Sequence, residues 1–92
     1  MRGVLFVTER QRLGHAGRLY RKARKIRGVV DAYPCLGRYD GLVFIEAPDA
    51  DHLNAVVVAV SRLPGVFSTD LHVEERETKS SSRPARPRAS NR

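Results

Sequence analysis

The sequence predicts an α+β fold in which one antiparallel sheet of four strands carries two helices. Apolar runs of strand length alternate with segments of helical period, and this order occurs twice along the chain. The length of 92 residues allows one small domain. The chain has a single cysteine, Cys35, and therefore cannot form an internal disulfide. A chain this short buries little surface on folding, and without a disulfide it often requires a partner chain for stability.

The repeated unit has an offset of 37 residues, which superimposes Gly28 on Gly65. In each half an apolar run precedes a segment of helical period. A basic residue, an aliphatic residue, any residue, glycine and valine then follow, at 25–29 and again at 62–66. This is the pattern of a strand-helix-strand unit written twice.

Four segments have the composition of strands. The first, Val4 to Val7, and the third, Leu42 to Ile45, are apolar at every position, which favours central strands buried on both faces. The second, near Val29 to Leu36, contains Pro34, which cannot donate to a ladder and therefore favours an edge. The fourth, from Phe67 to Val73, alternates between two faces, as an edge strand with one solvated face does.

Two helices are predicted from apolar residues spaced at three and four positions. The first runs from about Arg12 to Arg27 and turns one side to the core: Leu13, Ala16, Leu19, Tyr20, Ala23 and Ile26. The second buries Leu53, Val56, Val57, Val60 and Leu63. Asp49 or Asp51 can cap its first turn, and Pro64-Gly65 ends it because proline lacks an amide hydrogen and glycine accepts a left-handed conformation.

With the first and third strands central and right-handed crossovers, these elements form a ferredoxin-like βαββαβ sandwich. Two helices cover only one face of such a sheet, so the apolar residues of the other face need a second chain. On the central strands these are one of two alternating sets: Val4/Phe6 or Leu5/Val7, and Leu42/Phe44 or Val43/Ile45. We expect a homodimer that packs sheet on sheet, a dimeric α/β barrel-type assembly.

Lysine and arginine outnumber aspartate and glutamate by 17 to 10, which gives a net charge of +7. Residues 75–92 are basic and rich in serine and proline, so we expect a disordered tail behind a folded unit at 1–74. From Arg10 to Arg27 the chain holds eight basic residues and no acid. The single cysteine fits a reducing compartment, and no apolar run reaches the length of a signal-peptide core or a bilayer span. We therefore expect a cytoplasmic protein without a membrane partner.

The basic residues suggest one possible function. Those of the first helix share a face opposite its apolar side, and such a face is often only solvated. Together with the tail, this basic face could instead neutralise phosphates. It would then bind nucleic acid weakly, in a salt-sensitive way and without sequence preference. The candidate contacts are Arg18, Arg21, Lys22 and Lys25 in the helix and Arg83, Arg86 and Arg88 in the tail.

Few features of the sequence indicate an enzyme. His15, His52 and His72 occur at no metal-ligand spacing, and Cys35 has no histidine fixed near it in the sequence. We therefore predict a protein without catalytic residues, metal or cofactor. The fold alone leaves other classes open, because ferredoxin-like folds also include acylphosphatases and small dimeric oxygenases.

The connection between the second and third strands contains the most particular stretch, Gly37-Arg38-Tyr39-Asp40. Gly37 permits a tight backbone path, and Asp40 can accept hydrogen bonds from the amides of the loop or from the ammonium group of a ligand. The alternative interpretation of the same residues is a simple hairpin turn in which the aspartate accepts hydrogen bonds only from its own loop.

Three motifs in register, Gly28-Val29, Gly37-x-Tyr39-Asp40 and Gly65-Val66-x-x-Thr69, resemble the effector-binding domain of the Lrp/AsnC family of feast/famine regulators. The resemblance covers Val4 to about Glu74. It is nearest to stand-alone members that lack the amino-terminal helix-turn-helix, because three residues precede the first predicted strand. It implies domains that pair through their sheets into dimers, often assemble into octamers, and bind small effectors, typically amino acids, between dimers near the Gly-x-Tyr-Asp loop.

The resemblance also implies a set of site residues. Gly37 and Tyr39 would offer backbone and ring to an amino acid, and Asp40 would meet its ammonium group or fix the loop. Thr69 matches the first threonine of the last-strand motif. The implied function is a non-catalytic module in transcriptional regulation that reports amino-acid availability to a full-length DNA-binding relative or to an enzyme. A nucleic-acid-associated accessory protein that uses the basic helix and tail is the alternative.

Overall fold

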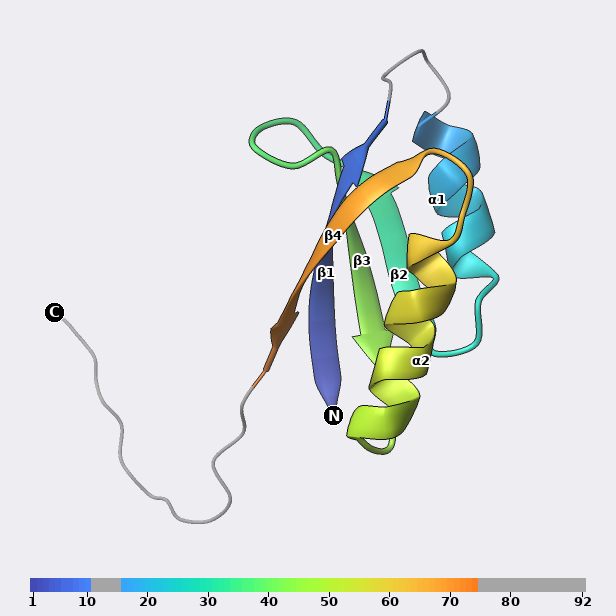
Figure 1. The fold of residues 1–92 in the computed structure, drawn as a ribbon, viewed down its shortest axis with the longest axis vertical. Helices are drawn as coiled ribbons and strands as arrows, with labels where there is room; N and C mark the ends of the chain where they lie inside the picture. The colour runs from blue at the N-terminus through green and yellow to red at the C-terminus, as the bar shows by residue number, and fades with distance from the viewer. Residues whose placement is uncertain (11–15, 75–92) are drawn as a thin grey trace, which may run out of the picture.

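The computed structural model describes residues 1–10 and 16–74. Its six elements follow the order βαββαβ (Figure 1): β1 (Arg2–Glu9), α1 (Ala16–Arg24), β2 (Val29–Pro34), β3 (Gly41–Glu46), α2 (Ala50–Ser61) and β4 (Val66–Val73). The expected start of the first helix and the basic tail, with Arg83, Arg86 and Arg88, lie outside the described residues. The predicted ferredoxin-like βαββαβ fold is confirmed.

The sheet has the strand order β2-β3-β1-β4, and all neighbouring strands are antiparallel. The two strands that are apolar throughout are therefore central, as predicted. Pro34 lies at the end of edge strand β2, paired with Gly41, where its missing amide hydrogen disrupts the ladder least. Both helices lie on the same side of the sheet (Figure 1).

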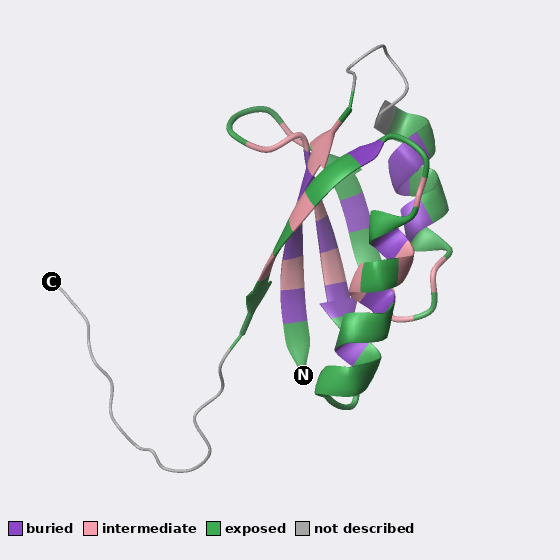
Figure 2. Cartoon of the chain, in the orientation of Figure 1, coloured by how far each residue is buried: buried purple, intermediate pink, exposed green. Residues whose placement is uncertain are grey.

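The core lies between this helix layer and the sheet, and Figure 2 shows buried residues in both layers. Leu5 and Val7 of β1 pair with the buried face of β3, which carries Val43 and Ile45. Of the two alternating sets that the sequence left open, these are the residues beneath the helices. Val4, Phe6, Leu42 and Phe44 consequently belong to the opposite face, called here the open face.

The helices bury the residues that their periodicity predicted. In α1 these are Leu19, Tyr20 and Ala23, and in α2 they are Leu53, Val56 and Val60. Ile26, Val57 and Leu63 are only partly buried and pack at the margin of the core. Leu13 and the side chain of Ala16 lie outside what the structure describes.

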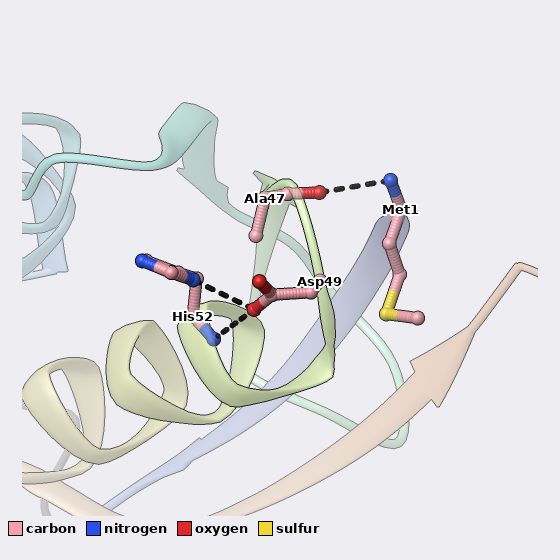
Figure 3. A network of polar contacts seen from close by, with 4 residues as sticks. All are labelled: Met1, Ala47, Asp49 and His52. Atoms are coloured by element: carbon pink, nitrogen blue, oxygen red, sulfur yellow. Dashed lines mark hydrogen bonds and ion pairs between the residues drawn. The ribbon is translucent and has the colours of Figure 1, made fainter.

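The helix ends follow local chemistry. Asp49 caps α2, because its Oδ1 accepts from the amide of His52 at 2.9 Å and lies 2.6 Å from the His52 ring (Figure 3). In the same figure the amino group of Met1 donates to the carbonyl of Ala47 at 2.8 Å. Neither helix in the described part of the chain is long and apolar enough to cross a membrane.

The predicted end of the first helix at Arg27 is wrong. α1 ends at Arg24, and the amides of Lys25 and Ile26 donate to carbonyls three residues back, which tightens the last turn. Gly28 then takes a positive φ of 101° and directs the chain into β2. Gly65, with a φ of 100°, occupies the equivalent turn after α2, as the repeat predicts.

Candidate effector-binding loop and sheet face

The Gly-x-Tyr-Asp loop joins β2 to β3 and projects away from the sheet (Figure 1). Its base is closed by the Cys35 amide, which donates to the Asp40 carbonyl at 2.9 Å, and by the Cys35 thiol, which lies 3.4 Å from the Tyr39 carbonyl. At its tip Gly37 has a φ of 129°, and nothing lies within 4 Å of the position that a Cβ atom would occupy. The backbone of the tip is thus open to a ligand or a second chain.

Asp40 fixes this loop to the end of β1. Its Oδ2 accepts from the Glu9 amide at 2.7 Å, and its own amide donates to the Val7 carbonyl at 2.8 Å. Of the two roles considered for Asp40, the geometry directly displays the structural one.

A buried tyrosine supports the loop from the helix side. The Tyr20 hydroxyl donates to Glu9 Oε2 at 3.0 Å, and a Cβ atom on Gly41 would lie 1.9 Å from the hydroxyl oxygen. Burial, followed by the bond to Glu9, raises the pKa of Tyr20 well above its ordinary value, so the phenol stays protonated and remains a donor. Glu9 therefore connects α1 to the loop, a role that sequence reasoning missed.

Tyr39 lies on the open face within a polar-aromatic group of four residues, Phe6, Tyr39, Asp70 and His72, called here the Tyr39 cluster. The Tyr39 ring centroid is 4.9 Å from that of Phe6, and its hydroxyl donates to Asp70 Oδ2 at 3.1 Å. His72 Nε2 is 3.3 Å from the same oxygen, and the His72 ring meets Phe6 edge-on. Asp70 and His72 are alternate residues of β4 and therefore lie on the same face of the sheet. The alternation of polar and apolar residues in β4 could have predicted that these two side chains lie together.

Thr69 lies apart from Tyr39. It pairs with Val7 in the β1–β4 register and so belongs to the helix-covered face. Its Oγ1 is 3.2 Å from Ser61 Oγ, and the Ser61 hydroxyl donates to the Val57 carbonyl at 2.8 Å. The structure thus brings Gly37, Tyr39 and Asp40 together on one loop but places Thr69 beside the end of α2.

The basic residues of the first helix are where their spacing predicts. Arg18, Arg21, Lys22 and Lys25 are all exposed. Arg24 is different because its guanidinium donates to the Ala32 carbonyl and so fastens α1 to β2.

The histidines and the cysteine form no metal centre in the described residues, where no group of three or more His, Cys, Asp or Glu side chains is placed to hold an ion. His52 belongs to the cap of α2, and His72 belongs to the Tyr39 cluster. His15 lies outside the described residues.

The open face carries apolar side chains that a single chain leaves accessible. Val4, Phe6, Leu42 and Phe44 are half-buried, and the Phe44 ring is 5.7 Å from that of exposed Tyr33. A hollow of about 600 Å³ on this side is lined by Val4, Val30, Tyr33 and Phe44 among others. A second open hollow, of about 680 Å³, lies away from the loop between α2 and the turn at Gly28.

The sequence matches the family model of the Lrp/AsnC ligand binding domain over residues 4–84. The chain belongs to this family of regulatory ligand-binding domains, as the three motifs indicated. No curated protein matches the sequence closely enough to serve as a relative.

Solved structures share the fold at low sequence identity. A hypothetical protein of Pyrococcus horikoshii has 17% identity and a TM-score of 0.73, with 89% of this chain and 98% of that chain covered. AsnC of E. coli has 13% identity and a TM-score of 0.73, with 88% and 54% covered. A transcriptional regulator of Neisseria meningitidis in complex with L-Met has 17% identity and a TM-score of 0.71, with 88% and 53% covered. This chain therefore corresponds to about half of each of the two regulators.

Proposed function

We propose that residues 1–74 form a non-catalytic module that binds a small effector, an amino acid, and couples this binding to assembly in transcriptional regulation. The observation that carries the proposal is the construction of the Gly-x-Tyr-Asp loop. Asp40 clamps its base to β1, whereas the tip at Gly37 has open space around it. A role in transcription would place the protein in the cytoplasm.

The loop offers the two kinds of groups that an amino acid requires. Leu36, Gly37 and Arg38 are exposed residues, and their backbone amides can donate to a carboxylate. The Asp40 carboxylate and nearby carbonyls can accept from an ammonium group. Tyr39 adds an aromatic surface beside them. Thr69 lies beside the end of α2, so in this proposal it contacts the effector only if the bound ligand also reaches that end of the helix, either in the same chain or from the site of a second chain.

Assembly would complete the site. The apolar open face supports a homodimer formed by packing sheet on sheet, since burial of Val4, Phe6, Leu42 and Phe44 removes apolar surface from water. A further contact between dimers at the loops would bury Leu36, which is 89% exposed. Dimers that meet at their loops would enclose the effector and could build an octamer.

The mechanism of such a module is linkage. An effector bound between dimers stabilises the assembled state by its higher affinity for that state, and assembly raises effector affinity by the same factor. A full-length DNA-binding relative, or an enzyme, would then respond to the assembly state.

Native mass spectrometry of the purified protein, alone and with a pool of the twenty amino acids, tests this function. We expect a dimer or a larger assembly that retains the mass of one amino acid per site, with the assembly distribution shifted by the ligand. A dimer that retains no amino acid at any concentration tested would contradict effector binding, and a monomer would contradict assembly.

A further inference from the structure

The outer surface of α1 carries a compact row of positive charges. Arg18 lies one turn before the neighbouring residues Arg21 and Lys22, and Lys25 follows directly after the helix. All four are exposed, whereas the opposite side of α1, with Leu19, Tyr20 and Ala23, is buried. This set of four is called here the α1 basic row.

Within residues 1–10 and 16–74, no acidic side chain forms an ion pair with the row that would give it a structural role. α1 contains no aspartate or glutamate, so its cations have no acidic neighbour three or four residues away. Among the described residues the ion pairs join Arg2 to Glu46, His52 to Asp49 and His72 to Asp70, and none includes the row. Within the row, like charges instead follow each other at spacings of three and four, which disfavours the helix.

The residues around the row indicate which kind of negatively charged partner it can bind. Insertion into a membrane surface requires apolar side chains beside the charges, but the large apolar residues of α1 are buried in the core. Binding of single strands uses exposed aromatic rings on which bases stack, and Tyr20, the aromatic residue of α1, is only 1% exposed. What remains for the row is contact with regularly spaced phosphates.

We propose that the α1 basic row binds the sugar-phosphate backbone of double-stranded nucleic acid without reading its sequence. From Arg18 to Lys25 the row extends about 10 Å along the helix axis, which corresponds to about three steps of 3.4 Å along one strand of a duplex. Arginine and lysine are the side chains that contact phosphates most often. Outside the segment from Arg10 to Arg27, residues 1–74 carry more acidic than basic side chains, so the positive field is concentrated at α1.

The position of the row makes this binding independent of the effector site. α1 lies on the side of the sheet opposite the open face (Figure 1). A dimer formed through the open face would therefore expose one row on each of its two outer sides. Such a dimer would bring two duplexes together rather than occupy one duplex with both rows.

The test compares two variants of the full chain that lose the same net charge. The first replaces the row (Arg18→Gln, Arg21→Gln, Lys22→Gln and Lys25→Gln), and glutamine preserves helix propensity. The matched control replaces four tail arginines (Arg83→Gln, Arg86→Gln, Arg88→Gln and Arg92→Gln). Fluorescence anisotropy measures binding to two short DNA duplexes of unrelated sequence between about 50 and 200 mM salt, and thermal unfolding followed by circular dichroism confirms that both variants are folded.

We expect the wild-type chain to bind both duplexes equally. The row variant should lose at least about tenfold in affinity, and its salt dependence should flatten by about 0.9 per phosphate contact removed. The tail control should retain most of the affinity and slope. Equal losses in both variants would show that net charge alone determines binding and would overturn the proposal.

Three further results would also overturn it: loss in the tail control only, no duplex binding by the wild-type chain, or binding to vesicles that contain phosphatidylserine in preference to the duplex. Failure here is distinguishable from failure of the proposed function. The row variant should still form the same assembly and retain the same amino acid in native mass spectrometry, because the row touches neither the loop nor the open face.

Discussion

The carboxylate of Asp40 accepts a hydrogen bond of 2.7 Å from the backbone amide of Glu9, a residue that lies 31 positions earlier in the chain. The side chain of Glu9 in turn accepts from the hydroxyl of buried Tyr20. Glu9 thus connects three parts of the fold, namely the loop, the end of β1 and α1. A ligand that changed the position of Asp40 would act directly on this connection, which is how a small effector could influence a larger part of the fold.

Replacement of Asp40 separates its two roles. Asp40→Ala removes the acceptor of the partly buried Glu9 amide, so we expect the free energy of unfolding to fall by about 1–3 kcal/mol and amino-acid binding to disappear. Asp40→Asn keeps an oxygen acceptor but removes the charge. It should retain most of the stability yet still lose binding. Urea denaturation and calorimetric titration measure the two effects, and full affinity in Asp40→Asn would exclude an ion pair between Asp40 and the effector.

Phe44→Glu tests the open face as the dimer interface. Phe44 lies on central strand β3 beside Val4 and Tyr33, so a carboxylate there would be desolvated by a second sheet but would remain hydrated in a monomer. We expect a folded monomer by size-exclusion chromatography with light scattering. Val58→Glu, on the exposed side of α2, is the control and should remain a dimer. A dimeric Phe44→Glu variant would mean that the chains associate through another surface.

Gly41→Ala should destabilise the protein, because the new Cβ atom would lie 1.9 Å from the buried Tyr20 hydroxyl oxygen. Relief of this overlap requires Tyr20 to leave Glu9 or β3 to shift, and we expect a loss of roughly 1–3 kcal/mol or more in the free energy of unfolding. Gly17→Ala is the matched control. Its Cβ would meet only the end of the flexible Arg21 side chain at 3.5 Å, and alanine stabilises a helix relative to glycine by up to about 1 kcal/mol. Similar unfolding midpoints for the two variants would contradict the packing described for Tyr20.

We expect the Asp49 cap of α2 to contribute to stability in a pH-dependent way. The pKa of Asp49 is lowered from its ordinary value of 3.8, first by the His52 amide that donates to it and then by the His52 side chain. A lowered folded-state pKa means that the stabilisation is fully present above the unfolded pKa, near 3.8, and is lost as the pH falls through the folded value. Asp49→Asn keeps a capping oxygen but does not titrate. In thermal unfolding the melting temperature of the wild type should be higher than that of Asp49→Asn at pH 5 to 6. The two melting temperatures should converge in stronger acid. A constant difference across this range would exclude titration of Asp49 as the cause.

Much of the fold was determined by the sequence alone, because the relevant signals are local. The apolar runs at Val4 to Val7 and Leu42 to Ile45 indicated central strands, Pro34 indicated an edge, and apolar spacing identified the core side of α2. The three glycine-containing motifs were enough to indicate the family. The strand and helix signals depend on residues a few positions apart, which is the range over which helical and strand periods operate. Each family motif is equally short, and the family was indicated because three of them occur in register along the chain.

Other features were decided only by the tertiary structure. A strand that is apolar at every position has no alternation, so only helix packing could place Leu5 and Val7 beneath the helices and leave Val4 and Phe6 on the open face. Strand register brought Asp70 and His72 beside Phe6 and Tyr39, and it placed Thr69 on the other side of the sheet. The links from Glu9 to Asp40 and to Tyr20 join residues far apart in the chain, and no local pattern specifies such contacts.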